Sequence, residues 1–455
     1  MELRTSGARQ VHEVGPLLDR SAWSAYQKAI TLLAALAVTF DGFDIQILAF
    51  AIPSIMREWH VARSAFAPIA ALGLAGMAFG SPAAGYCGDR FGRRLTLIGC
   101  VLLFGFATIA TAFAHTLTEL AVLRIIAGIG VGGALPNASA LTAEFAPLMR
   151  RAMAVTLTIV CVPLGGMLAG LVAARVLPSM GWRTLYLIGG AAPLLYVLLL
   201  LVALPESPRF LARHAALSAK RSGELIRILC RMGHTVDGDA VFAGGPEWEG
   251  KAGSLAELFT PELVRNTIGL WIAFFASLVG MYLILGWLPA MLSAQGIDNA
   301  TASSGLAAYN FGGVAGVLLC AAIITTLGSR LPMLSFAIGG GASALALMFV
   351  RIAPVGGHVL LIAGIALTGF FLNAVQTTLF ALASHVYPTR VRASGVACAA
   401  ATGRAGGMLS SLAGAAIIQA GSRVFLLVLV AAMAVTFAGL TIVRNHYPGR
   451  SEPQL

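Results

Sequence analysis

Long apolar runs separated by short polar segments make up almost the whole chain. Twelve runs can be counted, and each is close to or above the roughly 20 residues that a helix needs to cross a bilayer. Because backbone groups in lipid must be hydrogen-bonded within their own segment, each run is predicted to be a transmembrane helix. The runs of the first half are Ala29–Ile52, Ala65–Tyr86, Leu95–Ala114, Leu120–Leu141, Ala152–Ala173 and Thr184–Leu204. Those of the second half are Asn266–Leu292, Ser303–Leu327, Leu331–Val350, Val359–Leu382, Ala393–Ala415 and Val424–Val443.

The longest polar stretch, residues 205–265, separates the first six runs from the last six. We therefore predict an all-α membrane protein with twelve transmembrane helices in two six-helix bundles, at 29–204 and 266–443. The polar remainder is predicted to form an N-terminal tail at 1–28, a central loop at 205–265 and a C-terminal tail at 444–455.

Composition supports lipid as the solvent, since 58% of the 455 residues are hydrophobic and only 11% are charged. A soluble protein of this size could not cover so much apolar surface. The six cysteines are scattered without metal-ligand spacing, so we interpret them as reduced packing residues and expect no metal and no cofactor. The polar first residues lack the short apolar core of a cleaved signal peptide.

The formal net charge of +11 is compatible with nucleic-acid binding, but the placement of the basic residues indicates topology instead. Most of the 30 lysines and arginines lie in the tails, in the central loop and in the other loops on the same side of the membrane. The positive-inside rule then places both termini in the cytoplasm. We expect contact with the lipid bilayer, and no nucleic-acid partner.

The two halves repeat one another at corresponding positions. Glu144–Pro147 is followed by Arg151, and His385–Pro388 is followed by Arg392 at the same spacing. Each stretch connects the fourth and fifth apolar runs of its half. Internal repeats of this kind are typical of secondary transporters, whose substrate site lies between the repeats near the midplane.

Asp41 and Asp44 are the candidate proton-coupling residues. They lie three residues apart in the first apolar run and therefore share one helix face. An aspartate near the centre of a membrane helix costs about 2.5–3.5 kcal/mol, and such residues usually mark a substrate or proton path. Gly42 between them would let another helix or a ligand approach closely. The alternative is an internal ion pair or a hydrogen-bonded carboxylate that serves helix packing.

Arg124 and Arg404 lie inside apolar runs, and both are candidate ligands of an anionic substrate. Arg124 lies at a depth comparable with Asp44, with which it could pair. Arg404 lies close to the midplane, and no acidic residue falls in the apolar core of the second half. Since an unpaired buried arginine is costly, an organic carboxylate is the predicted substrate class. Alternatively, Arg404 pairs with Asp41 across the halves, or with carbonyl groups.

Aromatic and amide side chains in the second half could complete a substrate site. The aromatic candidates could sandwich a ring, although such residues are more often packing or interface anchors. The amide candidates could bond a ring hydroxyl, although intramembrane amides also hold helices together. The aromatic candidates are Tyr282, Trp287 and Tyr309, and the amide candidates are Asn310, Asn373 and Gln376.

The loop after the second apolar run reads Gly85-Tyr86-Cys87-Gly88-Asp89-Arg90-Phe91-Gly92-Arg93-Arg94. It resembles the signature loop of the major facilitator superfamily. The resemblance implies the major facilitator fold and a latch that holds the cytoplasmic ends of the two halves in one conformation. A carboxylate near a helix N-terminus and an arginine near a carboxylate would make such a latch, although the loop arginines could also serve topology alone. The candidate latch residues are Gly85, Asp89, Arg90, Arg93, Glu144 and Arg392.

A narrower resemblance rests on Asp41-Gly42-Phe43-Asp44 in the first apolar run. This motif is similar to the signature of the aromatic acid/proton symporter family, and stretches around Arg124, Glu144, Pro205–Phe210 and Arg392 fit the same family. The resemblance implies import of benzoate-type acids, such as hydroxybenzoates and protocatechuate, together with protons.

Two stretches depart from that pattern. Residues 327–332, the loop of the second half that corresponds to the signature loop, lack the aspartate of a fuller repeat. The fifth run lacks the glycine before Pro163 that the antiporter motif would carry, which favours symport.

We therefore expect a monomeric transporter of the bacterial inner membrane that imports a small aromatic carboxylate by proton symport. A porter for a sugar, a nicotinate-like acid, an organic cation or a drug is the alternative within transport. A receptor that binds without transporting is a further alternative. An enzyme is not expected, because no nucleophile–base constellation, metal cluster or phosphate-binding loop is present in the sequence.

Overall fold

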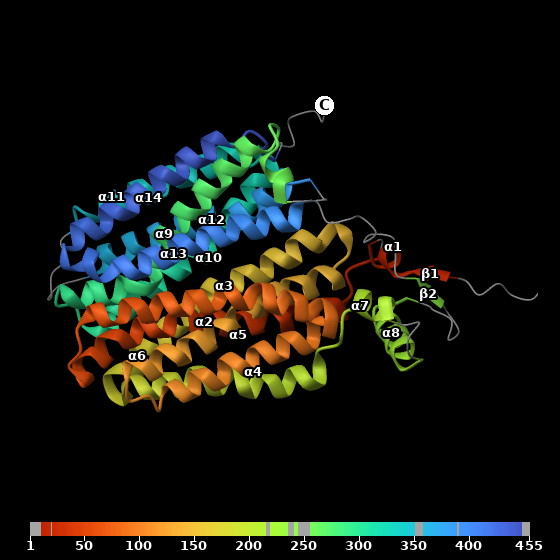
Figure 1. Ribbon diagram of the computed structural model, residues 1–455, viewed down its shortest axis with the longest axis horizontal. Coiled ribbons are helices and arrows are strands. Elements are labelled where there is room, and N and C mark those ends of the chain that lie inside the picture. The colour runs from red at the N-terminus through yellow and green to blue at the C-terminus, as the bar shows by residue number, and fades with distance from the viewer. Residues whose placement is uncertain are drawn as a thin grey trace, which may run out of the picture.

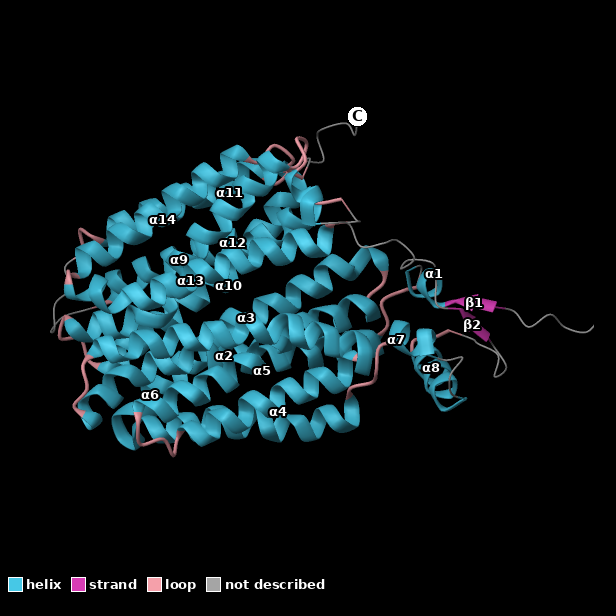
Figure 2. Cartoon of the chain, viewed as in Figure 1, coloured by secondary structure: helices cyan, strands magenta, loops and turns pink. Residues whose placement is uncertain are grey.

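The computed structural model describes residues 11–19, 21–214, 219–234, 241–243, 255–350, 358–388 and 391–447. These residues are almost entirely helical (Figure 2). The first part of the chain contains β1 (Val11–Glu13), α1 (Val14–Asp19), α2 (Ala25–Trp59), a 3₁₀ turn (Arg63–Ala65), α3 (Phe66–Phe91), α4 (Arg93–Thr111), α5 (Leu117–Phe145) and α6 (Leu148–Ala203). The central part contains α7 (Pro208–His214), α8 (Ala219–Arg231), β2 (Val241–Ala243) and a 3₁₀ turn (Leu255–Phe259). The last part contains α9 (Val264–Ala294), α10 (Asn299–Leu327), α11 (Arg330–Leu347), α12 (Val359–Val386), α13 (Arg392–Gln419) and α14 (Ser422–Ile442).

The twelve predicted transmembrane helices are present, although two of them require comment. Ten helices of the described residues are long and apolar enough to cross a membrane. One of these, α6, is 56 residues long and contains Gly181 at φ 76° and ψ 177°, which is not helical, so α6 consists of two successive helices. The twelfth is α13, which is less apolar than the others because it is rich in small residues and contains Arg404.

The helices form two bundles. Helices α2 to α6, red to yellow-green in Figure 1, make the first bundle, and α9 to α14, green to blue, make the second. The bundles meet where α6 packs against α10, α3 against α13 and α2 against α9. Residues from α2, α3, α9 and α13 therefore come together between the two bundles.

Gly42 illustrates how closely the helices of the first bundle pack. A Cβ atom at this position would collide with the backbone carbonyl of Val162 on α6. The sequence allows either a helix or a ligand to approach Gly42 closely. In the structure the neighbour is a helix, α6. The contact fixes the rotation of α2 and thereby the direction in which Asp41 and Asp44 point.

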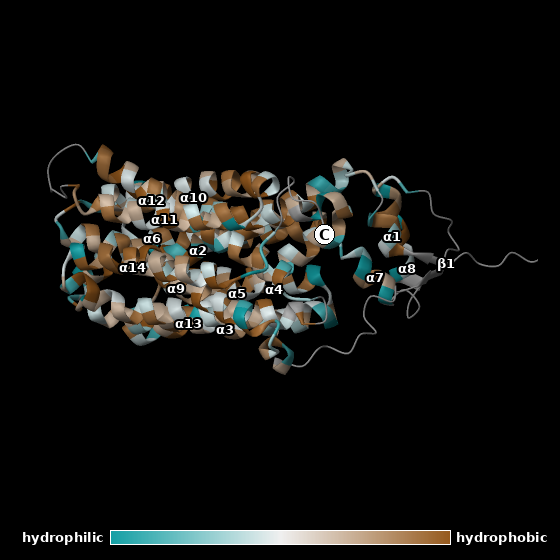
Figure 3. Ribbon diagram, turned by 90° about the horizontal axis from the view of Figure 1, so that it is seen from above, coloured by the Kyte–Doolittle hydropathy of each residue, from teal (hydrophilic) through white to brown (hydrophobic). Residues whose placement is uncertain are grey.

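Polar segments of the tail and the central loop fold together at one end of the molecule. Strand β1 pairs in parallel with β2, with Val11 opposite Val241, and α1, α7 and α8 lie beside them (Figure 1). Leu18 of α1, Leu211 of α7 and Leu225 of α8 are buried in one cluster with the first bundle. We call this end the tail end. Polar residues gather there, whereas the helices between the two ends are predominantly apolar (Figure 3).

An aspartate fastens this assembly to the first bundle. The Asp19 carboxylate forms ion pairs with Arg151 at 2.5 Å and with Arg209 at 3.2 Å. Arg151 belongs to the start of α6 and Arg209 to α7, so Asp19 joins the N-terminal segment to both. The sequence predicted polar segments here but not that they would pack together.

Candidate functional site

A buried ion pair joins α2 and α5 of the first bundle. Arg124 Nη2 of α5 is 3.5 Å from Asp44 Oδ1 of α2, and the two residues are 5% and 2% exposed. The Arg124 Nη1 group also donates to the backbone carbonyl of Asp44 at 3.4 Å, and the Thr108 hydroxyl of α4 donates to Asp44 Oδ1. The pairing between Asp44 and Arg124 that the sequence allowed is confirmed.

The pair leaves hydrogen-bonding capacity on Arg124 unused. Its Nε and Nη2 atoms are buried and have no hydrogen-bond partner. Nη2 forms an ion pair with Asp44, but at 3.5 Å this contact is not a hydrogen bond. The guanidinium group also lies over the Tyr186 ring at 5.3 Å. Two free N–H groups on one side of a guanidinium match the two oxygens of a carboxylate.

Arg124 lines a cavity between the bundles. The cavity has a volume of about 60 Å³, which holds a few water molecules. Asp44 and Arg124 of the first bundle line it together with Tyr282 of α9 and Ser411 of α13. The rest of its wall is apolar and consists of Ile45, Leu48, Ala49, Ile52, Ile69, Ala70, Gly73, Leu74, Met77, Gly128, Leu285 and Gly286.

Asp41 is the second carboxylate of α2 and is only 1% exposed. Its Oδ1 atom has no hydrogen-bond partner, so the carboxyl group is buried with little compensation. Tyr282 of α9 packs against Gly407 of α13, three residues after Arg404, so Arg404 lies within one helical turn of this contact. The described ion pairs do not include Asp41 with Arg404, so the expected alternative of a direct pair is not observed.

The other predicted substrate residues do not line this cavity. Trp287 is fully buried against Gly414, and Tyr309 packs at the contact between α10 and α12. Asn373 donates to the carbonyl of Gly369 within its own helix, α12. Their roles in substrate binding remain predictions.

Gln376 on α12 is buried without hydrogen-bond partners, as are the Trp287 indole nitrogen and the Tyr309 hydroxyl. It is 5% exposed, and neither its amide nitrogen nor its amide oxygen has a hydrogen-bond partner. A buried amide that satisfies neither group is costly. It therefore remains available to a polar group of a ligand.

Asn310 on α10 forms a reciprocal amide pair with Gln46 on α2. Gln46 Nε2 donates to Asn310 Oδ1 at 3.0 Å, and Asn310 Nδ2 donates to Gln46 Oε1 at 2.7 Å. Toward the end opposite the tail end, Asn299 Nδ2 of α10 donates to the Ser54 hydroxyl of α2 at 3.4 Å. These bonds connect the two bundles, the amide pair at the depth of the cavity and the Asn299–Ser54 bond nearer the end opposite the tail end. We call them the opposite-end contacts.

The predicted latch residues cluster at the tail end, around Arg93. Its guanidinium group pairs with Asp89 at 2.5 Å and lies 3.6 Å from the Glu144 carboxylate. Arg90 is exposed and donates to the Tyr86 hydroxyl at 3.0 Å, while no neighbour lies close to Gly85. Arg392 begins α13, but its side chain lies outside the described residues. The described contacts of the cluster lie within the first bundle, so its part in latching the bundles together remains a prediction.

Glu206, which follows α6, lies beside the cluster formed by Asp89, Arg93 and Glu144, which we call the latch cluster. Its Oε1 atom accepts from the backbone N–H groups of Arg94 at 3.1 Å and Ser207 at 2.9 Å. The Ser207 hydroxyl in turn donates to Glu144. Burial raises the pKa of the Glu206 carboxyl above its usual range, and the nearby Glu144 charge adds to the increase, although the backbone N–H groups oppose it.

Sequence reasoning assigned no role to Gln46, Thr108 or Ser411. Gln46 is a polar residue in the same apolar run as the two aspartates, and this is a signal that could have identified it. Ser411 follows Arg404 by seven residues and therefore lies on the same helix face. Thr108 carries no such signal, because threonine is common in membrane helices. No group of metal-ligating side chains occurs among the residues that the structure describes.

Comparison with known proteins gives consistent results. A sequence profile described as the Major Facilitator Superfamily matches residues 34–355 and 270–454. The chain is 33% identical over 437 residues to the gallate transporter of Pseudomonas putida, covering 96% of this chain and 95% of that protein. It is 32% identical over 409 residues to the 4-hydroxybenzoate transporter PcaK of Acinetobacter baylyi, covering 88% and 87%.

Solved structures agree on the fold. The xylose transporter XylE from E. coli in an inward open conformation superposes with a TM-score of 0.72 at 20% identity, covering 93% of this chain and 98% of that one. At this identity the likeness concerns the fold alone. Together with the two bundles of membrane helices, the profile match and the relatives show that this chain is a multi-pass membrane transporter that belongs to the Major Facilitator Superfamily.

Proposed function

We propose that this protein imports a small aromatic carboxylate of the benzoate or hydroxybenzoate type together with protons. The single observation that carries the proposal is the buried Arg124 guanidinium, which lines a cavity between the bundles and whose Nε and Nη2 atoms have no hydrogen-bond partner. The relatives that transport gallate and 4-hydroxybenzoate support an aromatic acid as the substrate.

The substrate carboxylate binds Arg124 in this proposal. Two charge-assisted hydrogen bonds to Nε and Nη2 would satisfy buried groups that otherwise have no hydrogen-bond partner, which favours an anion over a neutral ligand. The aromatic ring then lies against Tyr282 and the apolar wall formed by Leu48 and Leu285. Because the cavity holds only a few water molecules, the ring binds after the helices around it have moved apart.

Gln376 and Arg404 have distinct roles in the proposal. Gln376 offers a donor and an acceptor, both unpartnered, and would bind a ring hydroxyl. Arg404 lies within one helical turn of the contact between Gly407 and Tyr282, and it would compensate the charge of Asp41 after proton release.

Protons are carried by Asp41, with Asp44 as a second participant. Asp44 already has Arg124 and the Thr108 hydroxyl as partners, whereas one oxygen of Asp41 has none. Desolvation disfavours the charged form of an unpartnered carboxylate, so Asp41 is the better proton acceptor. A proton and a substrate anion together leave the cavity closer to neutral, and this favours the conformational change.

Alternating access would use contacts at both ends. The opposite-end contacts between Gln46 and Asn310 have to break before the cavity can open on that side. The latch cluster around Arg93 would hold the tail end when that end closes. The basic residues of the tail end favour the cytoplasm for both termini, and the bacterial relatives favour the inner membrane.

Uptake into proteoliposomes tests the proposal. Labelled 4-hydroxybenzoate is supplied with and without an inward proton gradient, and other acids, xylose and an organic cation are added in excess. We expect accumulation that depends on the gradient and is reduced by aromatic acids alone. Failure of every aromatic acid to accumulate or to compete, with folded and correctly inserted protein, would overturn it. Binding without accumulation would instead favour a receptor.

A further inference from the structure

A second cavity, of about 920 Å³, lies at the tail end where the start of α2 meets the start of α6. It is remote from the transport cavity and shares no lining residue with it. Its wall consists of Asp19, Ser21, Ala22, Trp23, Lys28, Pro147, Met149, Arg150 and Met153.

The cavity is positively charged. Lys28 and Arg150 are both exposed in it, and the described ion pairs include neither residue. The acidic residue of the wall, Asp19, is already neutralised by its ion pairs with Arg151 and Arg209. Two cations without counter-ions therefore face the same space, which favours a ligand with negative charge.

Trp23 gives the cavity the character of a membrane interface. The Lys28 ammonium lies over its ring, 5.8 Å from the centroid. The indole Nε1 atom is buried and has no hydrogen-bond partner. Tryptophan is enriched at the level of lipid headgroups, because its ring is apolar and its N–H group can donate to a headgroup oxygen.

An apolar stripe leads away from the cavity along α6. Met153, Leu157, Leu168 and Leu171 have exposed fractions of 49%, 44%, 40% and 50%, and their spacing places them on the same face as Arg150. In a membrane protein such an exposed apolar face contacts acyl chains. Cationic groups at the end of an acyl-chain surface are the arrangement that a phospholipid requires.

The two cations are carried by a firm framework. Ser24 and Gln27 form a capping box at the start of α2, and Gln27 Nε2 donates to the carbonyl of Phe145 at the end of α5 at 2.7 Å. Arg151 Nε donates to the carbonyl of Ala143, 3.1 Å away, which ties the start of α6 to α5. The backbones that bear Lys28 and Arg150 are therefore held in place relative to one another.

We propose that this cavity binds the headgroup of an anionic glycerophospholipid. Its phosphate lies between Lys28 and Arg150, the indole of Trp23 donates to a headgroup oxygen, and an acyl chain follows the stripe from Met153 along α6. Each basic residue near a membrane surface strengthens the binding of anionic lipid by a similar amount. Two such residues correspond to a preference of about 30-fold for an anionic over an uncharged lipid headgroup.

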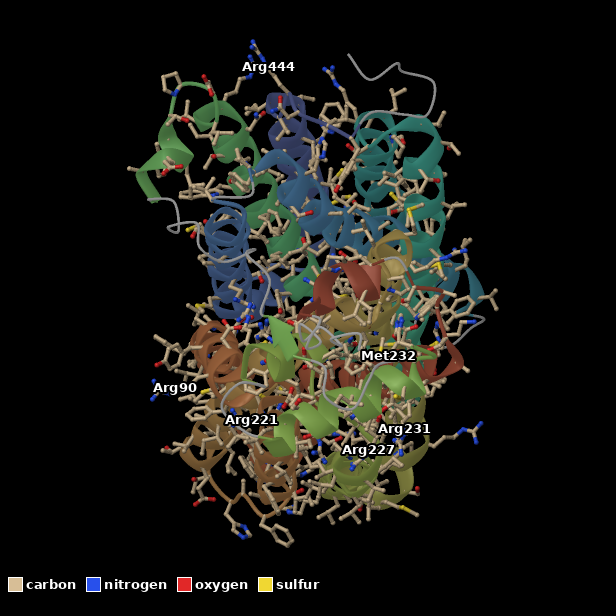
Figure 4. All side chains as sticks on the ribbon, turned by 90° about the vertical axis from the view of Figure 1, so that its right-hand side faces the viewer. Arg90, Arg221, Arg227, Arg231, Met232 and Arg444 are labelled. Carbon is tan, nitrogen blue, oxygen red and sulfur yellow. The ribbon has the colours of Figure 1, made fainter. Side chains whose placement is uncertain are left out.

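Native mass spectrometry of the purified full-length protein tests the proposal. The wild type and the double variant Lys28→Gln/Arg150→Gln are titrated with phosphatidylglycerol and with phosphatidylcholine. We expect the double variant to bind phosphatidylglycerol about 30-fold more weakly and phosphatidylcholine about equally. Arg221→Gln/Arg227→Gln is the matched control, since it removes the same charge from α8 (Figure 4) and changes no residue of the cavity wall.

Three results would overturn the proposal. The first is undiminished phosphatidylglycerol binding in the double variant. The second is an equal loss in the α8 control, which would indicate unspecific attraction by the basic end. The third is full displacement of the lipid by millimolar inorganic phosphate, which would indicate a site for free phosphate. If the double variant fails to fold, Trp23→Phe replaces it, and an unchanged preference for phosphatidylglycerol in that variant likewise contradicts the proposal.

Discussion

The two bundles have the same architecture but bury different chemistry. In the first bundle and the segment that follows it, Asp41, Asp44, Arg124 and Glu206 are buried charged residues. In the described part of the second bundle, no acidic or basic side chain is buried to that extent, and the buried polar residues are amides and hydroxyls. Arg404, its one basic residue inside an apolar run, is only partly buried. The two bundles thus share the arrangement of their helices, whereas the buried charged residues lie in the first bundle and the segment that follows it.

This difference suggests a division of tasks. Charged groups can exchange protons and bind an anion, so these tasks fall to the first bundle. Amides and aromatic rings discriminate by shape and hydrogen bonding, so selection of the ring and its substituents falls to the second bundle. The following predictions test this division, beginning with the largest expected effect.

Breaking the ion pair of the first bundle should have the largest effect. Arg124→Gln leaves Asp44 buried without its partner, and such a change destabilises a protein by about 3–5 kcal/mol. Arg404→Gln in the second bundle should lower the free energy of unfolding much less, because Arg404 has no described ion-pair partner. Thermal unfolding in detergent, followed by tryptophan fluorescence, compares the two. The double variant Asp44→Asn/Arg124→Gln should recover part of the lost stability. If it lost as much stability as Asp44→Asn and Arg124→Gln lose together, a direct pair would be contradicted.

Removal of the proton acceptor should uncouple transport. Asp41→Asn keeps the size of the side chain and cannot release a proton, so gradient-driven accumulation should fall at least tenfold while exchange of labelled for unlabelled substrate persists. Proteoliposome uptake and counterflow measure the two activities. Thr111→Val is the control and should remain coupled, because the Thr111 hydroxyl donates to the carbonyl of Ala107 within α4. Accumulation by Asp41→Asn at the wild-type level would exclude Asp41 as the proton carrier.

The second bundle should govern substrate selection rather than coupling. Gln376→Leu removes the unpartnered amide, so the KM for 4-hydroxybenzoate should rise about tenfold while that for benzoate changes little. Competition uptake gives both values. Thr378→Val is the matched control on the same helix, because the Thr378 hydroxyl is bonded to backbone carbonyls of α12. An equal rise for both acids would argue against recognition of the ring hydroxyl.

The opposite-end contacts should bias the conformational equilibrium. Gln46→Leu/Asn310→Leu removes two reciprocal hydrogen bonds, each worth about 0.5–1.5 kcal/mol, and should favour opening of that end by roughly tenfold. The rate at which a membrane-impermeant maleimide labels a cysteine introduced at Ser54 reports the opening. The same cysteine in the wild-type background is the reference, and equal labelling rates would show that the amide pair does not hold this end closed.

The smallest effect is expected at Glu206. Since burial raises its pKa in the folded state, the protonated form is favoured there, and this contribution to stability is lost as the pH rises from the unfolded value of about 4.3 through the folded pKa. Glu206→Gln keeps an oxygen that accepts from the backbone of Arg94 and Ser207 but carries no charge. Its unfolding temperature should therefore fall less than that of the wild type between pH 4 and pH 8. A steeper fall of the unfolding temperature in the variant would contradict a raised pKa of Glu206 in the folded protein.

The sequence predicted the membrane helices well because lipid leaves a chain few alternatives to apolar helices. It also predicted that Asp44 and Arg124 could pair, since their depths follow from helix geometry. The assembly of β1 with β2 was not predicted, because strands of three residues carry little pattern and their partners lie far apart in the chain. Which arginine keeps free N–H groups beside the cavity was also beyond the sequence, because this depends on side-chain geometry.

Binding of matched ligands to two arginine variants tests the central claim most directly. Isothermal titration calorimetry compares 4-hydroxybenzoate with the uncharged 4-hydroxybenzamide on the wild type, Arg124→Gln and Arg404→Gln. The wild type should prefer the acid by about tenfold to a hundredfold, the range expected for hydrogen bonds to a charged group. We predict that Arg124→Gln loses this preference and that Arg404→Gln keeps it. Retention of the preference in Arg124→Gln and its loss in Arg404→Gln would contradict the assignment of the carboxylate to Arg124.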